Sequence, residues 1–353
     1  LGDVINVHYG KALKADQRVS NGSVHVFGSS GIVGNHDKTL CSYPTIIIGR
    51  KGSVGAITWA PDGGWIIDTA YYVEIKDNNK LDLRYLFYIL SGIDLTKKTI
   101  TTSIPGLNRD DLYDTFIKLP PFEEQKRIVD LLDKAEGIRQ KREQAIKLAD
   151  DFLRATFATM YGNPITNPKK WPVHLMGEII EFKGGNQPPK SDFIFEPKQG
   201  YIRLVQIRDF KSDKYATYIP QEKAKRIFEV DDVMIARYGP PVFQILRGLS
   251  GSYNVALMKA SPKENIRKGF IFYLLQLPEY HDVVVKNSER TAGQTGVNLE
   301  LLNKFNVPLP PIYYQDEILA RLARIEKFKE KIEISLNHLE MQFLSLQKRL
   351  MGF

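Results

Sequence analysis

The sequence has very little cysteine and no long apolar run. Cys41 is the only cysteine in 353 residues, so no disulfide can form within the chain, and a reducing compartment is its natural setting. No apolar stretch approaches the roughly 18 to 20 residues of a membrane-spanning helix, and the first residues do not resemble a signal peptide. We therefore expect a soluble, cytoplasmic protein with no membrane partner. The missing initiator methionine suggests that a few residues precede Leu1.

The motifs of several enzyme classes are also missing. There is no Walker A sequence, so we expect no ATP site, and the glycines of residues 28–34 lack the spacing of a dinucleotide-binding loop. Asn163-Pro164-Ile165-Thr166 lacks the aromatic side chain on which an adenine methyltransferase stacks its flipped base. The histidines and Cys41 show no metal-ligand spacing. We expect neither a cofactor nor a metal in this chain.

What the chain does have is ample apolar content and an excess of positive charge. Hydrophobic residues make up 43% of the sequence, which suits two or three folded domains. Lysine and arginine number 49 against 41 acidic residues, a net charge of +8. Such a charge favours a polyanionic partner, although many soluble proteins carry it without one.

One stretch organises the chain, from Leu119 to Gly162. Two prolines open it, and the next 40 or so residues contain no proline and a single glycine, which predicts one helix roughly 60 Å long. Counting in steps of three and four gives an apolar seam that predicts a coiled-coil core. Its core positions are Ile128, Leu131, Ala135, Ile138, Ala149 and Phe152. A second apolar row beside the seam, which includes Leu132 and Leu153, suggests more than one packing neighbour.

The chain is built twice. Residues 106–128 and 296–318 share glycine, asparagine, Leu-Pro-Pro, glutamine and isoleucine positions at a constant offset of 190 residues. The second copy also ends in a predicted long helix, from Tyr313 to about Leu350. Its predicted core positions recur every seven residues and are Ile318, Ile325, Ile332, Leu339 and Leu346.

These features predict an α+β fold with a pseudo-twofold repeat. Two similar mixed globular domains, 1–119 and 163–310, are separated by two long antiparallel helices, 120–162 and 311–353, which form a coiled-coil spacer. With one globule at each end, the helices would act as a ruler against B-DNA, whose helical turn is roughly 34 Å. Shortening both helices by one turn should then change the gap between two DNA half-sites. The alternative is a coil that serves only dimerisation or scaffolding.

The junction Leu119-Pro120-Pro121-Phe122-Glu123-Glu124-Gln125-Lys126-Arg127-Ile128 resembles that of specificity subunits of type I restriction-modification systems. In that family the pattern Leu-Pro-Pro-x-x-Glu-Gln-x-x-Ile joins a target-recognition domain to a spacer helix. The likeness covers essentially the whole chain and includes the glycine-rich segment 47–55. The second junction differs, because Tyr314 stands at the usual glutamate position, and Tyr238-Gly239-Pro240-Pro241 differs from the first glycine-rich turn.

The resemblance implies a non-catalytic subunit that reads DNA. Its two target-recognition domains would recognise the halves of a split double-stranded site, and its helices would bind methyltransferase subunits that use S-adenosylmethionine to methylate adenine. A motor-nuclease subunit would add ATP- and Mg²⁺-dependent translocation and cleavage. None of this chemistry would reside in the present chain.

Candidate DNA contacts are polar side chains in glycine-rich or polar loops, because arginine, lysine, asparagine and glutamine can bridge two groups of a base edge. Arg50 should occupy a strand end, as should Arg237 in the second copy, and replacing either by alanine should relax one half-site. A phosphate contact is the commoner alternative for each residue. The candidates are Arg50, Lys51, Thr101, Ser103, Asn186, Gln187, Lys190, Gln206, Arg208, Arg237, Tyr238, Arg290 and Gln294.

Two other functions fit parts of the sequence. One is a stand-alone DNA-binding regulator without a methyltransferase partner. The other is a Mg²⁺-dependent nuclease, because Asp62 followed by Glu74 and Lys76 fits a loose pattern of two metal-binding carboxylates and a lysine. That pattern is short, and the second copy has no equivalent.

Overall fold

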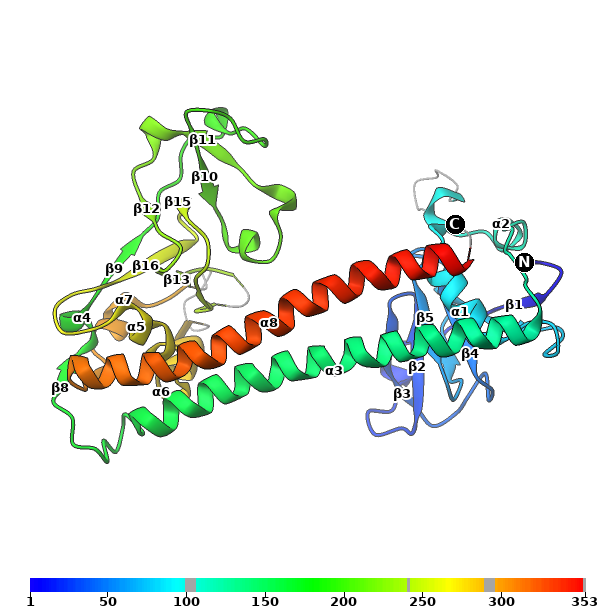
Figure 1. Ribbon diagram of the computed structural model, residues 1–353, viewed down its shortest axis with the longest axis horizontal. Coiled ribbons are helices and arrows are strands. Elements are labelled where there is room, and N and C mark those ends of the chain that lie inside the picture. The colour runs from blue at the N-terminus through cyan, green and yellow to red at the C-terminus, as the bar shows by residue number, and fades with distance from the viewer. Residues whose placement is uncertain (99–105, 240–241, 289–295, 352–353) are drawn as a thin grey trace. The chain divides into compact units, whose positions relative to one another are not determined.

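The computed structural model describes residues 1–98, 106–239, 242–288 and 296–351. The chain folds into two compact units, and each mixes helices with strands, as the predicted α+β class requires (Figure 1). Unit 1 is Leu1–Gln144 with Glu333–Phe353, and unit 2 is Ala145–Ile332. The border between the units crosses both long helices, so each unit contains a part of each. The four-segment division of the sequence into domains stays a prediction.

Unit 1 has two sheets. The first has the order β1-β7-β4-β5 and is antiparallel, and the second has the order β3-β2-β6 with β2 and β6 parallel. All five residues of β4 are buried, which explains its central position. The strands are β1 (Ile5–Tyr9), β2 (Val24–Gly28), β3 (Gly31–His36), β4 (Thr45–Gly49), β5 (Ile57–Ala60), β6 (Trp65–Ile66) and β7 (Ala70–Ile75). The short helices are η1 (Ala15–Gln17), α1 (Leu83–Gly92), η2 (Leu95–Lys98) and α2 (Arg109–Tyr113).

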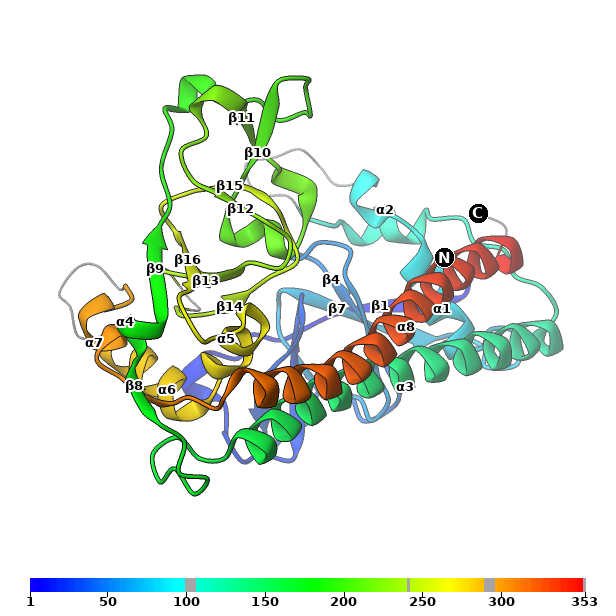
Figure 2. The ribbon, with the colours of Figure 1, turned by 60° about the vertical axis from the view of Figure 1, so that its left-hand side comes forward.

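Unit 2 has three sheets, of orders β9-β16-β13-β14, β11-β10-β15-β12 and β17-β8 (Figure 2). Its strands are β8 (Val173–Leu175), β9 (Ile180–Gly184), β10 (Tyr201–Val205), β11 (Tyr218–Pro220), β12 (Ile227–Phe228), β13 (Val233–Ala236), β14 (Ile245–Leu246), β15 (Gly251–Tyr253), β16 (Leu257–Pro262) and β17 (Asn306–Pro308). Its short helices are α4 (Met176–Ile179), η3 (Lys190–Asp192), η4 (Ile207–Phe210), η5 (Asp213–Tyr215), η6 (Gln221–Lys223), α5 (Lys268–Leu274), α6 (Pro278–Ser288) and α7 (Leu299–Asn303).

The two units share one topology, which confirms the predicted repeat. The order β9-β16-β13-β14 corresponds to β1-β7-β4-β5, and all pairs in both sheets are antiparallel. The order β11-β10-β15 corresponds to β3-β2-β6, and its β10–β15 pair is parallel like β2–β6. Unit 2 adds β12 at the edge of this sheet.

The glutamine of the repeated junction explains why the motif recurs. Gln125 is fully buried, accepts a hydrogen bond from the Asp82 peptide N–H (2.9 Å) and donates to the carbonyls of Lys80 (2.8 Å) and Pro120 (2.9 Å). Gln315 repeats the three bonds with its own neighbours, the Arg267 N–H and the carbonyls of Asn265 and Pro310. Buried backbone groups need partners, so this amide ties the helix start to the segment before α1 or α5.

The long helices are α3 (Phe122–Tyr161) and α8 (Ile312–Met351), each of 40 residues. Their segments run antiparallel in both units. In unit 1 the Arg142 guanidinium donates to the Ser335 carbonyl (2.7 Å), and Leu346 and Leu350 pack on the core that includes Ile128. In unit 2 the Tyr314 hydroxyl donates to the Met160 carbonyl (3.0 Å), and Lys329 forms an ion pair with Asp150 (2.6 Å).

The predicted seam of α3 was wrong in part. Leu131, Ile138 and Phe152 are exposed by 38%, 46% and 60%, whereas Leu132 and Leu153 are buried. The buried apolar positions of α3 include Leu132, four residues after Ile128, and then Leu153, Phe157 and Tyr161 at steps of four from Ala149. They are selected because Leu132 fills the core of unit 1 and the other three fill the core of unit 2. Ile128, Ala149 and Ile318 are buried, and Ile128 and Ile318 belong to the cores of the two units. The remaining predicted positions are half-buried: Ala135, Ile325, Ile332, Leu339 and Leu346.

Candidate nucleic-acid interface

The segments after β4 and β13 are held in the same way in the two units. The Arg50 N–H donates to the Thr69 carbonyl, and its carbonyl accepts from the Leu107 N–H (both 2.9 Å). In unit 2 the Arg237 N–H donates to the Ala256 carbonyl (2.8 Å), and its carbonyl accepts from the Val297 N–H (3.1 Å). The structure thus fixes both predicted strand-end arginines by main-chain bonds on two sides.

Aromatic rings surround the Arg50 side chain. Its guanidinium carbon lies 5.0 Å from the ring centroid of Tyr9 and 5.7 Å from that of Tyr71, and Nη1 donates to the Asp68 carbonyl (3.3 Å). Burial, with a hydrogen bond to Tyr9, raises the pKa of Tyr71 to about 12 against the lowering effect of Arg50. Tyr71 stays neutral near pH 7 and donates to the Leu107 carbonyl (3.0 Å). These contacts limit the rotamers of Arg50 before any ligand binds.

A second arginine, which the sequence analysis did not select, lies at the same ring. The guanidinium carbon of Arg109, the first residue of α2, lies 5.3 Å from the Tyr9 centroid and 5.9 Å from that of Tyr113. Its Nε is buried without a hydrogen-bond partner among the described residues. The sequence contained one usable signal, because the aligned junctions have Arg109 where the second copy has Leu299.

The Arg237 side chain packs against a different residue from the one that Arg50 packs against. The backbone bonds of Gly10 and Gly185 correspond, so Tyr9 and Gly184 occupy equivalent positions. A Cβ on Gly184 would lie 3.2 Å from Nη1 of Arg237, which therefore rests where a side chain would stand. The guanidinium also lies 4.9 Å from the ring centroid of Tyr238, and its buried Nε has no partner among the described residues.

Several predicted contacts of unit 2 gather near Arg237. Gly185 has no room for a side chain, because a Cβ would lie 1.9 Å from the Asn254 carbonyl oxygen. The Asn186 N–H donates to the Tyr253 carbonyl (3.1 Å), and the Asn254 N–H donates to the Val205 carbonyl (3.2 Å), one residue before Gln206. The structure therefore brings the segments of Asn186 and Gln206 to either side of one short connection.

The other predicted contacts of unit 2 are more exposed. Gln187, Lys190 and Arg208 are exposed, and Arg208 lies 5.6 Å from the ring of exposed Tyr215. Burial raises the pKa of neighbouring Asp209, which accepts a hydrogen bond from the Gln206 N–H (2.8 Å).

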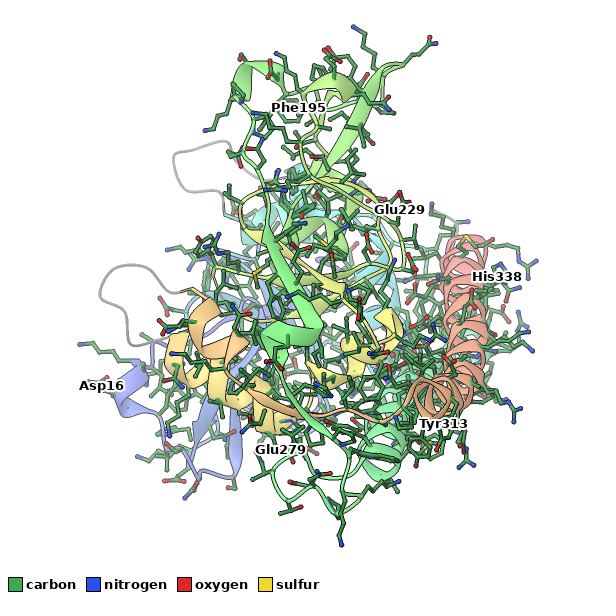
Figure 3. All side chains as sticks on the ribbon, turned by 90° about the vertical axis from the view of Figure 1, so that its left-hand side faces the viewer. Asp16, Phe195, Glu229, Glu279, Tyr313 and His338 are labelled. Atoms are coloured by element: carbon green, nitrogen blue, oxygen red, sulfur yellow. The ribbon has the colours of Figure 1, made fainter. Side chains whose placement is uncertain are left out.

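In unit 1 the predicted contact Lys51 is exposed beside Arg50, and its N–H donates to the Thr69 carbonyl (3.1 Å). Further along the loops of unit 2, Phe195 projects from the segment before β10 and is 72% exposed (Figure 3). Thr101, Ser103, Arg290 and Gln294 lie outside the described residues.

The loops that follow β4 and β13 have different residues at one equivalent position of positive φ. Gly55 and Phe243 are equivalent, because each N–H donates to the last residue of its strand, Gly49 or Ala236 (both 2.8 Å). Both have positive φ, +75° for Gly55 and +62° for Phe243. A phenylalanine in this region is strained, and its ring is fully buried in the core of unit 2. Burial offsets the strain that glycine avoids in unit 1.

The structure does not support Lys76 as the lysine of a nuclease site. The Lys76 ammonium donates to the Gly2 carbonyl (2.6 Å), and Lys263 makes the same bond to Gly177 (2.6 Å), so both are framework residues. A carboxylate oxygen of Glu74 lies within hydrogen-bond distance of Nε2 of His8 (2.9 Å). Across the described residues no three His, Cys, Asp or Glu side chains come together as a metal site would require. In the same residues no helix is both long and apolar enough to span a bilayer.

The repeated fold and the paired strand-end arginines define a protein with two related recognition units, and a family model agrees. The model named type I restriction modification DNA specificity domain matches residues 1–148 and 168–340. The chain belongs to this family. The match covers both units, and it confirms the resemblance seen at the Leu-Pro-Pro junction.

Individual relatives are distant. The type I restriction enzyme EcoBI specificity subunit of Escherichia coli is 22% identical over 84% of this chain and 70% of its own length. The MjaVIII specificity subunit of Methanocaldococcus jannaschii is 21% identical over 74% of this chain and 69% of its own. The S subunit structure from M. genitalium matches with a TM-score of 0.58 and 16% identity, covering 99% of this chain and 94% of that one. A chain from a structural study of a type I R-M system matches with a TM-score of 0.56 and 18% identity, covering 99% of this chain and 96% of that one. At such identities the structures show the fold alone.

Proposed function

We propose that this chain is the specificity subunit of a type I restriction-modification complex and reads a bipartite double-stranded DNA target without catalysis of its own. One observation carries the proposal: two units of one topology each hold an arginine after a central strand, in different surroundings. A shared frame with different contact residues is what two unlike half-sites require. The net charge of +8 suits a polyanionic ligand.

Base recognition in unit 2 is assigned to Arg237 with Asn186 and Gln206. Arginine can bind both acceptors of guanine, and asparagine or glutamine can bind adenine in the same bidentate way. The Arg237 guanidinium lies on Gly184 beside Tyr238, and the main chains of all three recognition residues are fixed by hydrogen bonds. Because their main chains are already fixed, these residues lose little backbone freedom on binding, and their side chains would discriminate between base edges.

The long helices are assigned to the methyltransferase subunits. Their outer faces carry large apolar side chains that cover no core of this chain. In unit 1 these are Leu131, Ile138, Ile334, Met341 and Leu344, and in unit 2 they are Leu148, Phe152, Phe328 and Tyr313. Figure 3 shows Tyr313 and His338 on the outside of α8. Exposed apolar surface of this extent supports a protein partner. S-adenosylmethionine, ATP and Mg²⁺ would bind to partner subunits, including a motor nuclease where one is present.

The test is a methylome. The chain is expressed together with type I methyltransferase subunits in cells that lack adenine methylation, and modified adenines are mapped. We expect a split motif with the parent chain, and a motif with one degenerate half with Arg237→Ala, because one bidentate contact contributes about 1 to 3 kcal/mol of discrimination.

Lys304→Ala, which removes an exposed charge of unit 2 that is paired with Glu300 (2.6 Å) and lies outside the long helices, is the control and should leave both halves intact. An unsplit motif, or equal relaxation of both halves, would contradict the proposal. Failure of the tagged chain to co-purify with the methyltransferase would favour the stand-alone regulator.

A further inference from the structure

Unit 1 holds two guanidinium groups at one tyrosine ring. The guanidinium carbons of Arg50 and Arg109 lie 5.0 Å and 5.3 Å from the ring centroid of Tyr9. The ring itself is 48% exposed, so the cluster opens to solvent. Tyr71 supports Arg50 from a second side, and Tyr113 supports Arg109. Both cations are therefore held in place by aromatic contacts.

The two charges are not compensated inside the protein. Among the described residues, neither Arg50 nor Arg109 forms an ion pair with an acidic side chain, although many other arginines of the chain do. Nε of Arg109 is buried without a partner in the same part of the chain. Neither charge is neutralised by an acidic side chain among the described residues, so a phosphate that reaches both guanidinium groups would form charge-assisted hydrogen bonds with each.

We propose that Arg50 and Arg109 together bind one phosphate group of the DNA backbone in unit 1. A phosphate carries a full negative charge and several acceptor oxygens, so it can take donors from two guanidinium groups at once. A base edge offers fewer acceptors and no charge, which makes two unpaired arginines a poor base reader. This inference rests on the proposed DNA-binding function and assigns Arg50 to positioning of the duplex instead of base recognition.

The described residues of unit 2 do not form the same site. The positions equivalent to Tyr9 and Arg109 are Gly184 and Leu299, so neither the ring nor the second arginine has a counterpart at its equivalent position. The proposed phosphate site is therefore assigned to unit 1. The two equivalent arginines take different roles, with Arg50 on the backbone and Arg237 on the bases.

The experiment measures how salt affects binding of the full chain to a fluorescently labelled duplex of arbitrary sequence. Because one phosphate contact is lost, the double variant Arg50→Ala/Arg109→Ala should flatten the slope of log affinity against log salt by about 1. Each single variant should weaken binding with a smaller change of slope, because the other arginine still neutralises the phosphate. The double lysine variant should keep most of the slope.

The matched control is Arg127→Ala, which removes an arginine of the same unit that is paired with Glu124 (2.7 Å). A double variant with the slope of this control would overturn the proposal, and a flattening of about 2 would show two separate phosphate contacts instead of a shared one. Relaxed target specificity in Arg50→Ala at unchanged slope would return Arg50 to base reading. A parent chain that binds no duplex at any salt concentration would refute the proposed function itself. Thermal unfolding of each variant verifies the fold.

Discussion

Arg50 and Arg237 occupy equivalent places in the two units, and their main chains make equivalent hydrogen bonds. Their side chains meet different surroundings, an exposed tyrosine ring with a second arginine in unit 1 and a bare glycine in unit 2. The comparison teaches that the side-chain surroundings can differ while the main-chain hydrogen bonds stay the same. Side chains at the strand ends can change without disturbing the bonds that hold the strand ends in place.

The same contrast exists inside the frame. Thr45, the first residue of β4, and Asp232, the residue directly before β13, occupy equivalent positions in the two units. The Thr45 hydroxyl donates to the Val73 carbonyl (2.6 Å) and accepts from its N–H (3.0 Å). Asp232 instead forms ion pairs with Lys259 (3.1 Å) and Lys268 (2.8 Å). A neutral hydrogen-bonded group in one unit is matched by a paired charge in the other.

The largest expected effect tests whether the buried glutamine of each junction stabilises both units equally. Gln125→Ala and Gln315→Ala each leave three partly or fully buried backbone groups without a side-chain partner. At about 1 to 3 kcal/mol for each unpaired group, we expect each variant to lower the free energy of unfolding of its unit by about 3 kcal/mol or more. Hydrogen exchange, measured separately over α1 and α5, gives the two losses.

The exposed Gln140, which bonds only to Glu136 of its own helix, provides the control, and its alanine variant should change stability by under about 0.5 kcal/mol. Strongly unequal losses in the two units would break the comparison of their frames.

A smaller effect is a difference between the units in how their stability depends on pH. Burial alone would raise the pKa of Asp232, but hydrogen bonds from Lys268, Lys259 and the Glu229 N–H outweigh it, and the pKa is lowered from its ordinary 3.8. A lowered pKa means that the stabilisation is present above the unfolded pKa and lost as pH falls through the folded one. Asp232→Asn should therefore cost unit 2 about 2 to 3 kcal/mol near neutral pH and progressively less below pH 3.8.

Thr45→Val is the counterpart in unit 1. It removes neutral hydrogen bonds, so its cost should be about 1 to 2 kcal/mol at every pH. Denaturation followed over a pH series gives both profiles. A cost of Asp232→Asn that does not vary with pH would show that its charge contributes nothing.

The smallest effect concerns the loop backbones. Gly55→Ala places a side chain at φ +75°, with its Cβ 3.2 Å from that of Leu95, and should cost about 1 to 2 kcal/mol. Gly200→Ala is the control for strain alone, because φ is +81° and nothing lies within 4 Å of the added Cβ. If Gly55→Ala proves neutral in chemical denaturation, backbone strain does not distinguish this loop from the one that contains Phe243.

Sequence reasoning predicted the elements that local pattern determines. The two prolines and the run without proline predicted a helix over residues 120–162, and α3 spans Phe122–Tyr161. The repeat was visible because Gln125 and Gln315 must satisfy identical backbone groups. β3 and β6 give little signal in the sequence, since one contains glycines and the other has two residues.

The rest depends on contacts between distant residues. Leu131 and Leu132 look alike in the sequence, and only packing of the globular part selects Leu132. Arg109 was not among the predicted DNA contacts, because it is singled out only by its position at the Tyr9 ring, and Tyr9 lies 100 residues earlier in the chain. The assignment of Arg50 and Arg237 to DNA contact stays a prediction, and the structure has supplied their surroundings.

The packing of Phe343, Leu346 and Leu350 on the core of unit 1 has a consequence for biosynthesis. Unit 2 is one continuous segment, Ala145–Ile332, and all of it is synthesised before those three side chains. The part of the chain translated first must therefore wait for the part translated near the end before its apolar surface is covered. Unit 1 completes its core only after the whole of unit 2 has been synthesised.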